Sequence, residues 1–99
     1  MKYTLVRRAE SDSGVSKEEC LGVYGKYKAI GKTVCTIRDD EQQWLSEGFS
    51  IEDSDNFYAV GTSGDGYGWF RQYHNSKTES TVVETYLLMP VPKEKEDAQ

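Results

Sequence analysis

The stretch that most constrains this chain is residues 56–73, NFYAVGTSGDGYGWFRQY, which holds half of the aromatic residues and four of the nine glycines. Two runs rich in strand-forming residues, 57–60 and 67–73, flank the segment Gly-Thr-Ser-Gly-Asp-Gly. Such runs on either side of a loop that accepts positive φ angles are typical of a β-hairpin. We therefore predict an antiparallel hairpin, with the rest of the chain packed around it.

Two short helices are predicted upstream of the hairpin. Ser16 and Glu19 form a capping-box pattern, which predicts a helix that begins at residue 17 and ends near Gly25. A second helix is expected to begin near Asp40 and to end at Gly48, because acidic residues favour a first turn and glycine favours a helix end.

Three further segments are predicted to be strands. Residues 2–8 alternate in polarity, residues 32–38 are rich in β-branched side chains, and residues 81–89 form an apolar run that ends at Pro90. The sequence thus predicts an α+β fold: an antiparallel sheet of about four to five strands, with a C-terminal three-stranded meander and two short helices packed on one face. We expect a single globular domain over residues 1–89 and a charged, disordered tail over 90–99.

The composition limits the classes of protein that fit. Ninety-nine residues are enough for one domain with a modest core. No apolar run approaches the ~20 residues of a membrane span, and the first ten residues lack the apolar core of a signal peptide. We therefore expect a cytoplasmic protein without a membrane association. Cys20 and Cys35 are expected to be reduced and to lie in the core.

The charge is unevenly distributed along the chain. The net charge is −5, yet residues 1–38 carry +4 and residues 39–70 carry eight acidic residues without any Lys or Arg. Acids without neighbouring cations produce a negative field, which solubilises a surface and can also steer a basic partner toward it. The block therefore admits two interpretations, a solvated face or a docking surface.

Known catalytic and metal-binding motifs are not found. The chain has one histidine, His74, and its two cysteines are fifteen positions apart, so no CxxC pair exists. The segment that begins at Asp53 departs from a calcium-binding loop because Tyr58 stands where that loop requires glycine. The glycine-rich segment 61–66 lacks the Lys-Ser/Thr pair of a P-loop. We predict a non-enzymatic protein without a metal or another cofactor.

The segment Gly66-Tyr67-Gly68-Trp69-Phe70 resembles the RNP1 motif of RNA-recognition motifs and cold-shock domains. The resemblance covers five residues, with Asp65 at the position where these families carry a basic residue. It implies that Tyr67 and Trp69 stack on the bases of a single-stranded nucleic acid. Binding of such a strand, or of a small ligand, through hairpin 56–73 is the alternative function.

The function favoured by the sequence is that of an acidic binding protein that docks on a basic surface of a partner protein. Immunity proteins, antitoxins and phage-encoded inhibitors resemble this chain in size and charge. Acids would steer the partner, and neighbouring aromatic side chains would supply the specific contacts. The sequence does not indicate an oligomeric state. The expected partner-binding residues are Asp39, Asp40, Glu41, Glu47, Glu52, Asp53, Asp55, Tyr58, Tyr67 and Trp69.

Overall fold

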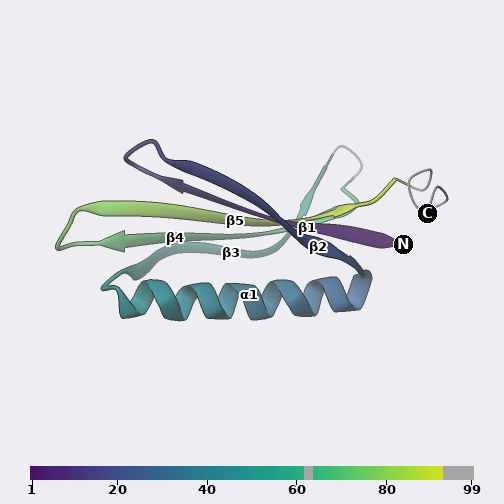
Figure 1. Cartoon of the computed structure of the whole chain (residues 1–99), viewed down its shortest axis with the longest axis horizontal. Helices are drawn as coiled ribbons and strands as arrows, with labels where there is room; N and C mark the ends of the chain where they lie inside the picture. Colours follow the sequence, from purple (N-terminus) through teal and green to yellow (C-terminus); the bar gives the residue numbers. More distant parts are fainter. Residues whose placement is uncertain (62–63, 93–99) are drawn as a thin grey trace.

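The computed structural model describes residues 1–61 and 64–92. Within these residues one helix lies on one face of a five-stranded antiparallel sheet (Figure 1). The strand order in the sheet is β2-β1-β5-β4-β3. The elements, in chain order, are β1 (Lys2–Ser11), β2 (Ser16–Gly25), α1 (Lys26–Ser46), β3 (Ser50–Val60), β4 (Gly66–Asn75) and β5 (Ser80–Pro90).

The predicted hairpin and meander are confirmed. Strand β3 pairs with β4 in an antiparallel register that joins Tyr58 to Gly68 and Val60 to Gly66, and β4 pairs with β5. The α+β class is therefore correct, but one helix takes the place of the two that were predicted. Of the predicted C-terminal tail, Pro90 still belongs to β5, and residues 93–99 lie outside the described part of the chain.

The predicted helix over residues 17–24 is wrong, because this segment is strand β2. It pairs with β1 across a tight turn in which the Ser11 amide donates to the Val15 carbonyl at 2.9 Å. Arg8 lies directly opposite Glu18 and donates to its carboxylate at 2.9 Å, a cross-strand pair that favours the hairpin. Pairing with β1 therefore overrides the capping-box pattern of this segment.

The predicted strand over residues 32–38 is also wrong, because this segment lies within α1. Ala29, Thr33 and Ile37 recur every four residues and form the buried stripe of the helix. The Thr33 hydroxyl donates to the Ala29 carbonyl at 2.8 Å, so the polar atom of this buried side chain is satisfied inside the helix. Burial of the stripe outweighs the weak helix propensity of the β-branched residues.

The predicted helix start near Asp40 is wrong, because α1 begins at Lys26, but termination of the helix by Gly48 agrees with the prediction. Gly48 adopts a φ of +94°, and its amide donates to the Leu45 carbonyl at 3.2 Å. The Phe49 amide donates to the Trp44 carbonyl at 3.0 Å, and the two rings pack edge to face at 4.9 Å. These contacts form a Schellman motif with its hydrophobic contact, which turns the chain from α1 into β3.

The helix gives the two faces of the sheet different environments. On the face toward α1, side chains of β1, β4 and β5 pack against Ala29 and Ile37 and form the core, which includes Tyr3, Leu5, Trp69, Tyr86 and Leu88. Strand residues alternate between faces, so their neighbours along each strand point away from α1. No other element of the described residues covers this second face, which we call the open face (Figure 1).

Candidate partner-binding site

The acidic block does not form one surface, because two of its acids are bound to the sheet. Asp40 points from α1 toward β1 and accepts from Arg7 at 3.0 Å, and Glu41 accepts from Arg71 of β4 at 2.7 Å. Both carboxylates are therefore neutralised within the chain and are not free charges for a partner. The sequence shows no cation within the block, but the fold brings one from each of two strands.

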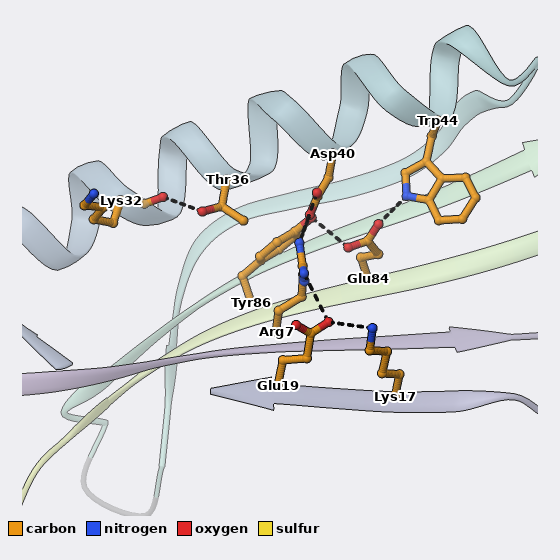
Figure 2. Close-up of polar contacts among 9 residues, drawn as sticks. All are labelled: Arg7, Lys17, Glu19, Lys32, Thr36, Asp40, Trp44, Glu84 and Tyr86. Carbon is orange, nitrogen blue, oxygen red and sulfur yellow. Dashed lines mark hydrogen bonds and ion pairs between the residues drawn. The ribbon is translucent and has the colours of Figure 1, made fainter. Parts of the chain in front are cut away.

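Asp40 belongs to a polar network between α1 and the sheet (Figure 2). The Trp44 indole donates to the Glu84 carboxyl, and the Tyr86 hydroxyl lies 2.9 Å from Glu84 and 2.6 Å from Asp40. On the far side of the network, Arg7 also donates to Glu19 at 3.1 Å, and Lys17 pairs with the same carboxylate. The network thus joins one helix to three strands, β2, β1 and β5.

The Tyr86 hydroxyl joins the two carboxyl groups of the network. The Tyr86 hydroxyl has one proton and lies between two carboxyl groups, so it can donate to only one of them. Glu84 is only 3% exposed, and its burial, together with the nearby Asp40 carboxylate, raises the pKa of Glu84 above its ordinary value. A neutral Glu84 that donates to Tyr86, which in turn donates to Asp40, satisfies every contact.

The network acts as a clamp for α1. A hollow of about 250 Å³ borders it, with walls formed by Arg7, Gln43, Trp44 and Glu84 among others. The cations at its rim are already paired: hydrogen bonds from Lys17 and then Arg7 hold the pKa of Glu19 below its ordinary value. Since each charged group has a partner within the chain, we assign the network to helix docking.

Six acids of the block remain, and the five of them that were predicted to bind a partner are exposed and lie in two places. Asp39 and Glu47 lie at the surface of α1 and at its C-terminal end. Glu52, Asp53 and Asp55 lie on β3, at the edge of the sheet. None of the ion pairs found among the described residues involves any of the five.

The three β3 acids lie together on the open face. Asp53 is opposite Gln72 and Asp55 is opposite Phe70, both of which alternate with the core-facing residues of β4. Glu52 accepts from Gln72 at 2.9 Å, which places its carboxylate beside the other two. We call Glu52, Asp53 and Asp55 the acidic edge.

Tyr58 lies on the same face, next to the acidic edge. It is opposite Gly68, and its ring covers the glycine so closely that a Cβ atom there would come within 2.6 Å of the ring. Tyr58 is half-buried, so one face of the ring remains accessible. Tyr58 thus lies beside exposed acids, and its contact with a partner stays a prediction.

The other two predicted aromatic residues lie on the opposite face. Trp69 is only 4% exposed and belongs to the core beneath α1, so the prediction that it contacts a partner is wrong. Tyr67 is half-buried between Tyr3, at 5.7 Å, and Phe57, at 4.8 Å. The resemblance to RNP1 therefore reflects packing: the aromatic residues fill the core, and the glycines make room for side chains of β3.

Phe57 was missed by the sequence analysis, although its position is unusual. It has a φ of +55°, which is rare for a bulky residue, at a bulge where the register shifts between Asp55 and Tyr58. The bulge turns the Phe57 ring to the helix-facing side, where it meets Trp69 at 5.4 Å and stays half exposed. A groove of about 270 Å³, lined in part by Asn56 and Arg71, lies nearby. A sequence pattern does not show a bulge, so the orientation of Phe57 could not be predicted from the sequence.

The residues considered for catalysis are not brought together. Cys20 is exposed on β2, Cys35 is exposed on α1, and both are free, so the prediction that they lie in the core is wrong. His74 contacts Thr81 at 3.0 Å on the neighbouring strand. Over residues 1–61 and 64–92, no group of three or more His, Cys, Asp or Glu side chains is placed to hold a metal ion.

Within the same described residues, no helix combines the length and the apolar character needed to cross a membrane.

Comparisons with known proteins found no matching family model, curated protein or solved structure.

Proposed function

We propose that this protein is a non-enzymatic binding protein that docks on a basic surface of a partner protein through the acidic edge. The observation that carries the proposal is the contrast within the acidic block. Asp40 and Glu41 are neutralised by arginines of the sheet, whereas Glu52, Asp53 and Asp55 are exposed side by side without a paired cation among the described residues.

Two physical arguments support a protein as the partner. Exposed acids at the rim of an interface raise the rate of encounter with a basic surface and make that rate sensitive to salt. Tyr58 adds an aromatic surface beside the acids, of the kind that anchors protein interfaces. An inhibitory role, like that of immunity proteins, antitoxins or phage accessory proteins, is consistent with this surface. Single-strand binding through Tyr67 and Trp69 is not favoured, since Trp69 is buried and the neighbouring charge repels phosphate.

The test compares two charge-reversed proteins in affinity capture from the cells that make the protein. The first carries Glu52→Lys, Asp53→Lys and Asp55→Lys, and the control carries Asp39→Lys and Glu47→Lys. We expect a basic protein, identified by mass spectrometry, to be captured by wild type and the control but not by the first variant. The association rate of that protein with wild type should fall as salt increases. Equal capture by all three proteins would reject the acidic edge as the docking surface.

A further inference from the structure

The open face also has an apolar end, adjacent to the acidic edge. Successive strand pairings align Cys20, Val6, Leu87, Gly68 and Tyr58 in one row across all five strands. The next row toward the chain ends pairs Val23, Thr4 and Met89 on β2, β1 and β5, and Gly66 with Val60 on β4 and β3. Gly66 lies beside Met89, since a Cβ atom on this glycine would come within 3.1 Å of the Met89 sulfur. Among the described residues no element packs over these two rows, which we call the apolar rows.

The apolar rows form a continuous exposed surface and are not isolated apolar residues. Val23 is 48% exposed and Met89 is 36% exposed, while Val6, Leu87 and Tyr58 in the adjacent row are half-buried. Contiguous apolar surface on a small protein commonly marks an interaction site. The half-buried centre matters most, because packing an apolar side chain of a partner against it removes the remaining area from water.

The charge around the apolar rows indicates what can cover them. The row on the other side of Leu87 contains Asp55, Phe70, Thr85, Arg8 and Glu18, and Arg8 is already paired with Glu18. Asp53 follows in the row beyond it. A second copy of the chain, with a net charge of −5, would bring like charges against this end of the face. Charge complementarity therefore favours a protein that carries cations next to its apolar surface.

The spacing of the two features can be derived from sheet geometry. Leu87 and Asp55 lie two strands apart and one row apart, which corresponds to about 10 Å across the sheet and about 7 Å along it. We propose, on the basis of the proposed function, that the apolar rows anchor the same partner protein. The partner then presents an apolar side chain about 12 Å from the Lys or Arg that pairs with Asp55.

A random dodecapeptide display library, panned against immobilised wild-type protein, provides the probe. Because an extended peptide rises about 3.3 Å per residue, we expect enriched peptides to carry an apolar residue three or four positions from a Lys or Arg. Their affinity should fall about tenfold for the double variant Val6→Thr and Leu87→Thr, which keeps strand propensity and removes apolar surface. Val34→Thr on α1, whose side chain is 42% exposed, is the matched control and should leave the affinity unchanged.

The outcomes separate this inference from the proposed function. Peptides that bind the double variant as tightly as wild type, but lose affinity for Asp53→Asn plus Asp55→Asn, overturn the apolar anchor and leave the acidic edge in place. Peptides with the opposite behaviour overturn the acidic edge as the docking surface. Failure to enrich any peptide overturns both.

Sedimentation velocity tests whether a second copy of the chain covers the apolar rows. A wild-type protein that sediments as a dimer, with a double variant that sediments as a monomer, would identify a second copy as the occupant and overturn the proposal. If the double variant does not fold by circular dichroism, Val23→Thr plus Met89→Thr replaces it.

Discussion

Gly66 and Gly68 show how single residues determine which side chains reach each face of the sheet. Both lie on the open face of β4 and both are crossed by a side chain of β3, but their surroundings differ. A Cβ atom at Gly68 would meet only the outer atoms of the Tyr58 ring, which can rotate away. At Gly66 it would come within 2.9 Å of the Leu88 carbonyl oxygen, which is part of the backbone of β5.

We therefore predict that Gly66→Ala destabilises the protein by about 1–3 kcal/mol, the usual range for overpacking. Gly68→Ala should cost less, since Tyr58 can move. Urea denaturation of the two variants measures the difference. A larger loss for Gly68→Ala would show that Tyr58 is held rigidly against β4.

Glu84 is the residue whose protonation matters most for stability. Its pKa is raised in the folded protein, so the folded state holds this proton more tightly than the unfolded state does. The stability that the protonated side chain contributes is present below the pKa of Glu84 in the unfolded chain, about 4.3. It is lost as the pH rises through the pKa of Glu84 in the folded protein. Between the two values the free energy of unfolding should fall by up to about 1.4 kcal/mol per pH unit.

Glu84→Gln tests this dependence, because the amide accepts from Trp44 and donates to Tyr86 as the protonated acid does. We expect the variant to gain stability relative to wild type as the pH rises, in urea denaturation at a series of pH values. Glu18→Gln, at an exposed carboxylate, is the control and should show no such gain. Parallel pH profiles for wild type and Glu84→Gln would mean that Glu84 is already ionised in the folded protein.

At the scale of the element, α1 is held to the sheet by packing and by the network around Asp40. Asp39 and Asp40 are sequence neighbours of the same type, yet Asp39 is exposed and Asp40 binds both Arg7 and Tyr86. Asp40→Ala leaves a partly buried arginine and a buried hydroxyl without their shared acceptor, and we predict a loss of about 2–4 kcal/mol. Asp39→Ala should change stability by less than about 0.5 kcal/mol. Since helix propensity changes equally in both, their difference in urea denaturation isolates the network, and equal values would remove its role as a clamp.

The elements that could be predicted are those whose own residues carry a clear turn or strand pattern. The β3–β4 hairpin, β5 and the end of α1 depend on local turn residues and strand-forming runs, and these predictions are confirmed. The errors concern segments whose own residue pattern is opposed by packing against another element. Segment 17–24 carries a helix-start pattern but pairs with β1, and segment 32–38 looks like a strand but has its buried residues at four-residue spacing.

The same distinction explains the predictions for the site. The acids and Tyr58 could be identified from the sequence, but which acids remain free depends on two distant arginines. Arg7 lies 33 positions from Asp40, and Arg71 lies 30 positions from Glu41. Likewise, the face on which Trp69 lies depends on where α1 packs. Neither fact is contained in a local pattern of residues.

At the scale of the whole molecule, the ends of the described chain meet in the middle of the sheet. Strand β1 pairs with β5 from Tyr3 opposite Pro90 to Ser11 opposite Val82, and the Val91 amide donates to the Lys2 carbonyl at 2.8 Å. This leaves β2 and β3 as the two edges of the sheet, with the acidic edge on the second of them. Charges on an edge strand can serve binding, as proposed here, or can prevent edge-to-edge association of the protein with itself.

Stability and self-association measurements distinguish these roles without the partner. Because the protein carries a net charge of −5 and the acids of the edge repel one another, Asp53→Asn plus Asp55→Asn should raise the melting temperature slightly at low salt. Added salt should raise the melting temperature of wild type more than that of the variant, since it screens a repulsion that the variant lacks. If the acids serve partner binding, the variant should sediment in the same state as wild type. Self-association of the variant alone would instead show that these acids protect an exposed strand, and a lower melting temperature would show that they stabilise the fold.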